Sequence, residues 1–167
     1  LKLINGWEVD DKKSQPVENK LAINWYNNKF HNTLELIDKN FNNYRISDAL
    51  MSSYRLIWDD FCSWLLEILK PNYGEKIDKK SKTELINLFE KNLKILHPFM
   101  PFLTEEIYHN IPHTNTSDAL TISSWPANEK YFSSIVDEFE ITKEIISQIR
   151  NYSCLLYTSD AADDLWC

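Results

Sequence analysis

The chain has 167 residues, enough for one domain whose core needs no disulfide or metal to hold it together. Its two glycines, six prolines and lack of a long apolar run argue against linker-rich, disordered and membrane-inserted proteins. The net charge of −7 is unlike that of a stand-alone nucleic-acid binder. Since the N-terminus also lacks the layout of a signal peptide, the cytoplasm is the expected compartment.

Residues 1–15 predict the end of a preceding helix followed by a connection. The first residues lead to Gly6, and glycine is common just past the C-terminus of a helix. Residues 8–15 are polar and show no apolar period. Because the chain begins with Leu1 rather than Met, we expect an internal piece of a longer protein.

A long helix is predicted from Pro16 to about residue 41, with Ser14 as its cap. Apolar residues recur at steps of three and four, which places them on one face: Ile23, Tyr26, Phe30, Leu34, Ile37 and Phe41. Trp25 lies off this face beside polar residues. This helix must therefore contact a second neighbour or leave a tryptophan in solvent.

The next predicted helix starts near Ser47 and ends at Pro71. Its apolar face is unusually wide and consists of Leu50, Tyr54, Ile57, Phe61, Leu65 and Ile68, broadened by Trp58, Cys62 and Trp64. Such a helix should be central, with neighbours on two sides. We expect Phe61 to be a core residue and Cys62 to act as a small core hydrophobe.

The remaining elements complete an all-α, antiparallel helical bundle with one long irregular connection. Residues 71–82 are a charged loop, and residues 85–96 form a helix that stops before Pro98. Pro101 can open a short helix to about Asn110. Residues 111–130 show no helical period, and a last helix is predicted over residues 133–150.

Two motifs resemble a known family. Residues 58–64, Trp-Asp-Asp-Phe-Cys-Ser-Trp, resemble the anticodon-binding domain of bacterial valyl-tRNA synthetases. Residues 96–108 are similar to the His-Pro-Phe-x-Pro-Phe-x-Thr-Glu-Glu element shared by class I synthetases for aliphatic amino acids. The resemblance covers about residues 16–152 and implies an anticodon-binding helical domain there. An isoleucyl or leucyl enzyme, and a helical protein-interaction module without RNA binding, remain as alternatives.

Residues 153–167 depart abruptly from the Asn-, Lys- and Ile-rich style before them. They resemble the translated adapter tail of truncated genes, so we expect them to be non-native and to lie outside the fold. This tail carries three acids and no base, so the net charge without it is −4. It also carries two of the three cysteines, which leaves Cys62 alone and removes the basis for a disulfide.

The sequence predicts neither a catalytic residue nor a metal site. Gly6 and Gly74 are the two glycines, so a glycine-rich phosphate loop is impossible. The family's two ATP signatures are absent, and the resemblance implies that ATP, Mg²⁺ and valine bind to domains outside this chain. His109 and His113 have helical ligand spacing, but Pro112 intervenes and no third ligand is near.

Structural roles are expected for the polar residues of the second motif. His97 precedes a proline at a helix end, where an imidazole can cap carbonyl groups. Glu105 and Glu106 should complement the positive N-terminus of their own helix.

The resemblance implies tRNA(Val) as the partner, with no role for DNA or a membrane, and a monomer is expected. Lys and Arg contact phosphates, whereas unpaired loop bases are read by stacking and edge hydrogen bonds. The candidate tRNA-binding residues are Trp25, Lys29, Tyr44 and Arg45. For Trp25, packing against another segment is the alternative. Tyr44 and Arg45 lie in a loop between two predicted helices, where RNA can be reached.

Overall fold

The structure is a computed structural model that describes residues 2–111 and 119–163, with side chains described for residues 3–111 and 119–152. The chain forms two compact units, Leu1–Tyr131 and Phe132–Cys167. None of the helices in the described part of the chain is long and apolar enough to cross a membrane.

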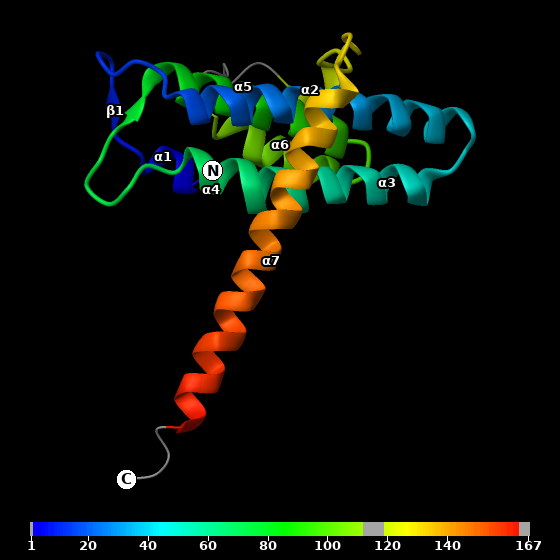
Figure 1. The fold of residues 1–167 in the computed structure, drawn as a ribbon. Helices are drawn as coiled ribbons and strands as arrows, with labels where there is room; N and C mark the ends of the chain where they lie inside the picture. Colours follow the sequence, from blue (N-terminus) through cyan, green and yellow to red (C-terminus); the bar gives the residue numbers. More distant parts are fainter. Residues whose placement is uncertain (1, 112–118, 164–167) are drawn as a thin grey trace. The chain divides into compact units, whose positions relative to one another are not determined.

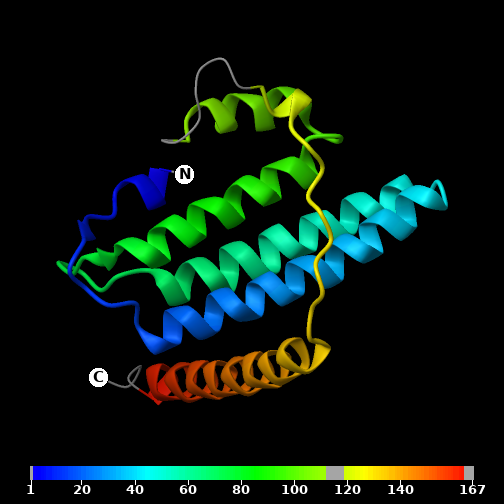
Figure 2. The same ribbon diagram turned by 90° about the horizontal axis from the view of Figure 1, so that it is seen from above.

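The first unit is a helical bundle (Figures 1 and 2). It contains α1 (Lys2–Asn5), α2 (Val17–Asn42), α3 (Ile46–Arg55), η1 (Leu56–Leu65), α4 (Leu66–Leu69), α5 (Lys79–Leu96) and α6 (Pro101–His109). Helix α2 packs against α3, η1, α4 and α5, and it runs antiparallel to the continuous helix α3–η1–α4. The predicted all-α antiparallel bundle is therefore confirmed. The described part of the long connection contains a single 3₁₀ turn, η2 (Leu120–Ile122).

Helix α2 buries the predicted face. Tyr26, Phe30 and Ile37 are fully buried, and Ile23 and Leu34 are nearly so. The helix begins directly after Pro16, and no side chain caps its N-terminus, so the predicted Ser14 cap is wrong.

The central helix follows the predicted span but not the predicted face. Residues 56–65 form a π-helix, in which each N–H bonds five residues back and each turn is wider than in an α-helix. Up to the middle of this π-helix the buried residues are Ala49, Ser53, Leu56 and Asp60, and from there on they are Phe61, Leu65 and Leu69. Leu50 and Tyr54 are therefore exposed, contrary to prediction, because the wide turns shift the buried face by one residue.

Phe61 is a core residue, as predicted, with 1% of its surface exposed. Its ring lies 5.4 Å from Tyr26 on α2 and 5.9 Å from Phe89 on α5, measured between ring centroids. The first sequence motif thus places an aromatic side chain where three helices meet. Cys62 is half-buried, and this burial raises the pKa of its thiol.

A short parallel strand pair was not predicted. Strand β1 (Val9–Asp10) pairs with β2 (Ile77–Asp78), with Val9 opposite Ile77. The buried Asp78 then caps α5, because its carboxylate accepts a hydrogen bond from the Ser81 amide at 2.8 Å. Helix α5 consequently begins at Lys79. The charged loop predicted over residues 71–82 is therefore shorter than expected.

The second unit contains α7 (Ser133–Asp163). The helix begins where the sequence predicts, but it continues past Arg150 into residues 153–163. Leu, Ala and other residues that tolerate helices are present there, so local propensity suffices to extend it. The foreign origin of the tail stays a prediction.

Candidate nucleic-acid interface

The turn between α2 and α3 closes the C-terminus of α2 in a Schellman arrangement. The Tyr44 amide donates to the Phe41 carbonyl at 3.0 Å, and the Arg45 amide donates to the Asn40 carbonyl at 2.8 Å. This pair of bonds requires a left-handed residue at the position of Tyr44, which is usually glycine. Tyr44 accordingly has a φ of 59°.

Tyr44 combines an unfavourable backbone with an exposed side chain. The left-handed region costs a residue with a Cβ about 1–2 kcal/mol. Burial of the ring does not offset this cost, because Tyr44 is 90% exposed. Glycine would suit the turn better, so this aromatic ring does not serve the fold. This backbone outlier makes Tyr44 a candidate functional residue.

Arg45 follows at the start of α3 and is also exposed. Its Nε donates to the Asp48 carboxylate at 2.6 Å, and the terminal nitrogens of the guanidinium carry four further N–H donors. An exposed ring and an exposed guanidinium therefore sit side by side on one turn. This pairing suits an RNA loop, which presents both bases and phosphates.

The other two predicted site residues do not join this turn. Trp25 is 1% exposed and packs edge-on against Tyr26, with 5.9 Å between the ring centroids. The side chain is therefore packed inside the bundle and is not exposed for stacking on a base. Lys29 is half-buried, with its Nζ 3.9 Å from the buried carboxylate of Asp60. Along α2 it also lies roughly 20 Å before the end of the helix at Asn42, at 1.5 Å per residue.

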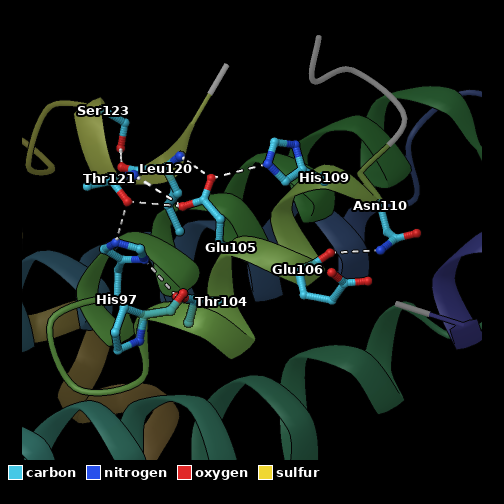
Figure 3. Close-up of polar contacts among 10 residues, drawn as sticks. His97, Thr104, Glu105, Glu106, His109, Asn110, Leu120, Thr121 and Ser123 are labelled. Carbon is cyan, nitrogen blue, oxygen red and sulfur yellow. Dashed lines mark hydrogen bonds and ion pairs between the residues drawn. The ribbon is translucent and has the colours of Figure 1, made fainter. Parts of the chain in front are cut away.

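The second motif builds a polar cluster between α5, α6 and η2 (Figure 3). The His97 ring contacts two hydroxyl groups, Thr104 Oγ1 at 2.8 Å from Nδ1 and Thr121 Oγ1 at 3.1 Å from Nε2. Thr104 is buried and also donates to the Met100 carbonyl at 2.9 Å. His97 thus has contacts of the expected structural kind at the end of α5, but its ring bonds to hydroxyl groups and not to carbonyl groups.

Glu105 fastens η2 to α6. Its carboxylate accepts hydrogen bonds from the Leu120 amide at 2.9 Å and the Thr121 amide at 3.3 Å, and it lies 3.3 Å from His109 Nε2. Partial desolvation opposes ionisation, but these hydrogen bonds and His109 outweigh it and lower the pKa of Glu105. The carboxylate accepts hydrogen bonds from the amides of η2. We had expected it to complement the N-terminus of its own helix, so that expectation is wrong for Glu105.

The imidazole, hydroxyl and carboxylate groups of this cluster contact one another, and these contacts join η2 to α5 and α6. Within the described ranges no group of three metal-ligating side chains occurs, and His113 lies outside them. Sequence reasoning missed Thr121, which no motif marks, while the Thr-Glu-Glu pattern could have indicated Thr104.

Comparisons with known proteins identify the family of this chain. Residues 24–153 match the family model for the anticodon-binding domain of tRNA ligase. Valine-tRNA ligases from Christiangramia forsetii and Parabacteroides distasonis are 48% and 38% identical to the chain over 149 residues. Each alignment covers 89% of this chain and 17% of the relative.

A valine-tRNA ligase from Bacillus cereus is 33% identical over 152 residues, which is 86% of this chain and again 17% of the relative. The chain thus spans 17% of the length of these relatives. Because the family model covers most of the chain, the chain belongs to the family of anticodon-binding domains of tRNA ligases.

Proposed function

We propose that this chain is the anticodon-binding part of a valine-tRNA ligase. The observation that carries the proposal is the family match over residues 24–153, together with valine-tRNA ligases of up to 48% identity along the same part. The remaining parts of the enzyme, outside this sequence, would activate valine with ATP and Mg²⁺ and transfer it to tRNA(Val). The whole protein would work as a monomer in the cytoplasm.

Within this part, the domain proper is residues 16–152, and its task is to hold the anticodon stem and loop. The turn at Tyr44 and Arg45 supplies the contact, with the Tyr44 ring available for stacking on an unpaired base and Arg45 for a phosphate. Support comes from the exposure of both side chains and from the left-handed backbone of Tyr44.

The affinity of this part alone should be modest, with a salt dependence set by a few phosphate contacts. The chain carries a net charge of −7, so long-range attraction to RNA is weak and a few local phosphate contacts dominate. Other parts of a complete ligase would provide most of the binding energy for tRNA.

Titration of the chain with tRNA(Val) at several salt concentrations tests the proposal. Arg45→Ala should weaken binding and flatten the dependence of log K on log salt by roughly 0.7–0.9, the value of one phosphate contact. Asp48→Ala is the matched control, because it breaks the same ion pair but keeps the arginine. Equal slopes for Arg45→Ala and the unchanged chain would remove Arg45 from the interface.

A further inference from the structure

An extended segment of residues 124–131, the strap, crosses the bundle and is fastened to α2 (Figure 2). Trp125 Nε1 donates to Asp38 at 3.1 Å, and the Tyr131 hydroxyl donates to Glu35 at 2.9 Å. Between them, the Glu129 amide donates to Nδ1 of His31 at 3.2 Å. The three acceptors are spaced four and three residues apart, so they lie on one face of α2.

The middle bond depends on the protonation state of His31. A ring nitrogen that accepts a hydrogen bond carries no proton, so the proton of neutral His31 must reside on Nε2. Nε2 lies 3.9 Å from the Glu129 carboxylate. If Nδ1 also gains a proton, two donors face each other and the bond to the Glu129 amide is lost.

The surroundings of His31 favour the neutral ring. His31 is 5% exposed, and burial, followed by the positive charge of Lys91 on α5, lowers its pKa. The Glu129 carboxylate and a hydrogen bond with Asn128, both on the strap, act in the opposite direction but are outweighed. Glu35, one turn further along α2, is engaged by Tyr131.

The two ends of the strap are held differently. Trp125 has a second contact, because its ring packs edge-on against Phe41 at 6.1 Å between centroids. Tyr131 is held by one solvent-exposed hydrogen bond, for which water can compete. If the middle bond is lost, residues 127–131 should therefore detach while Trp125 stays in place.

We propose that the strap is a pH-sensitive latch, whose residues 127–131 leave α2 on mild acidification while the helices stay folded, with His31 as the trigger. While the Glu129 amide donates to Nδ1, His31 stays neutral, and once the strap is detached Nδ1 is open to a proton. Attachment is thus fully favoured above the ordinary pKa of histidine and weakens as pH falls below it. Because the strap ends at Tyr131, where the bundle unit ends, detachment lengthens the linker to α7.

Amide hydrogen exchange of the chain between pH 7.5 and 5.5, corrected for intrinsic rates, tests the latch. The opening constant of the Glu129 amide should rise by up to about tenfold over this range, because the freed imidazole titrates near pH 6.5. Amides in the middle of α5 should not change. A Glu129 amide whose opening is independent of pH would overturn the proposal.

Two variants assign the effect to its residue. His31→Gln offers an amide oxygen that accepts at every pH, so the acid-induced opening should disappear. His109→Gln is the control, since His109 contacts Glu105 and not the strap, and its response should match the unchanged chain. A full response in His31→Gln would contradict the latch. NMR of the His31 ring gives a test without mutation, because a proton found on Nδ1 at pH 7.5 would also overturn it.

Discussion

Side chains that can bind a partner are arranged differently in two regions of the molecule. These regions are the cluster around His97 and Glu105, and the turn that carries Tyr44 and Arg45. The cluster has the stronger sequence motif, yet its side chains bind one another and hold η2 against α6. The turn carries no motif, yet it presents an aromatic ring and a guanidinium to solvent on a backbone that glycine would suit better. A recognisable motif here marks the scaffold, and the contact surface that we propose lies where the backbone conformation is least favourable.

The largest expected change in stability comes from a substitution in the core of the helical bundle. Phe61→Ala should lower the free energy of unfolding by about 3–5 kcal/mol, because it removes a buried ring and leaves a cavity where α2, η1 and α5 meet. Chemical denaturation measures this loss. Phe102→Ala makes the same change at a 91% exposed position and should cost less than about 0.5 kcal/mol. Similar losses in both variants would contradict our placement of the core.

A smaller loss is expected from the polar cluster. Thr104→Val keeps the shape but removes the hydroxyl that His97 Nδ1 contacts, so the unfolding free energy should drop by about 1–3 kcal/mol. Thr83→Val is the matched control, because Thr83 also bonds to the carbonyl four residues back but is exposed. Thermal or urea unfolding compares the two. If Thr104→Val behaves like Thr83→Val, the cluster does not fasten the fold.

At the turn between α2 and α3, a substitution should stabilise the chain instead of destabilising it. Tyr44→Gly should raise the unfolding free energy by about 0.5–1 kcal/mol, since glycine adopts the left-handed conformation without the cost of a Cβ. The same variant should bind tRNA(Val) more weakly, because the ring is lost. Tyr73→Gly, at another fully exposed tyrosine, should bring no gain in stability. A destabilised Tyr44→Gly chain would mean that the ring supports the fold after all.

The smallest effect is expected at the C-terminus. A chain that ends at Tyr152 should unfold within about 1 kcal/mol of the complete chain, because we expect residues 153–167 to be foreign to the domain. The family match, which ends at residue 153, favours this boundary. Calorimetry of the shortened chain decides it, and a larger loss would show that the extension of α7 is packed.

The sequence predicted those parts of the fold that rest on a repeating pattern. The apolar period located α2, α5 and the buried Phe61, and prolines marked where α5 and α6 end and begin. The π-helix was not predicted, because its wider turns shift the buried face without a change in amino-acid composition. Strands of two residues are too short for any period, which is why β1 and β2 were missed.

Only part of the candidate site could be predicted from the sequence. Tyr44 and Arg45 could be placed in a loop, but a tyrosine in the glycine position of a Schellman turn carries no sequence signature. Trp25 was a candidate for exposed stacking, with packing as the alternative, and it is buried because α2 packs against several helices. Thr121 and His31 became significant only when distant segments were brought together.

The central claim is that the turn between α2 and α3 contacts the anticodon loop, and photo-crosslinking from position 44 tests it most directly. With a benzophenone amino acid in place of Tyr44, irradiation with tRNA(Val) should give crosslinks that map to the anticodon loop. The same probe at Tyr73, an equally exposed position far along the chain, should give none there. Crosslinks from position 44 that map only to other parts of the tRNA, or none above the Tyr73 background, would contradict the account.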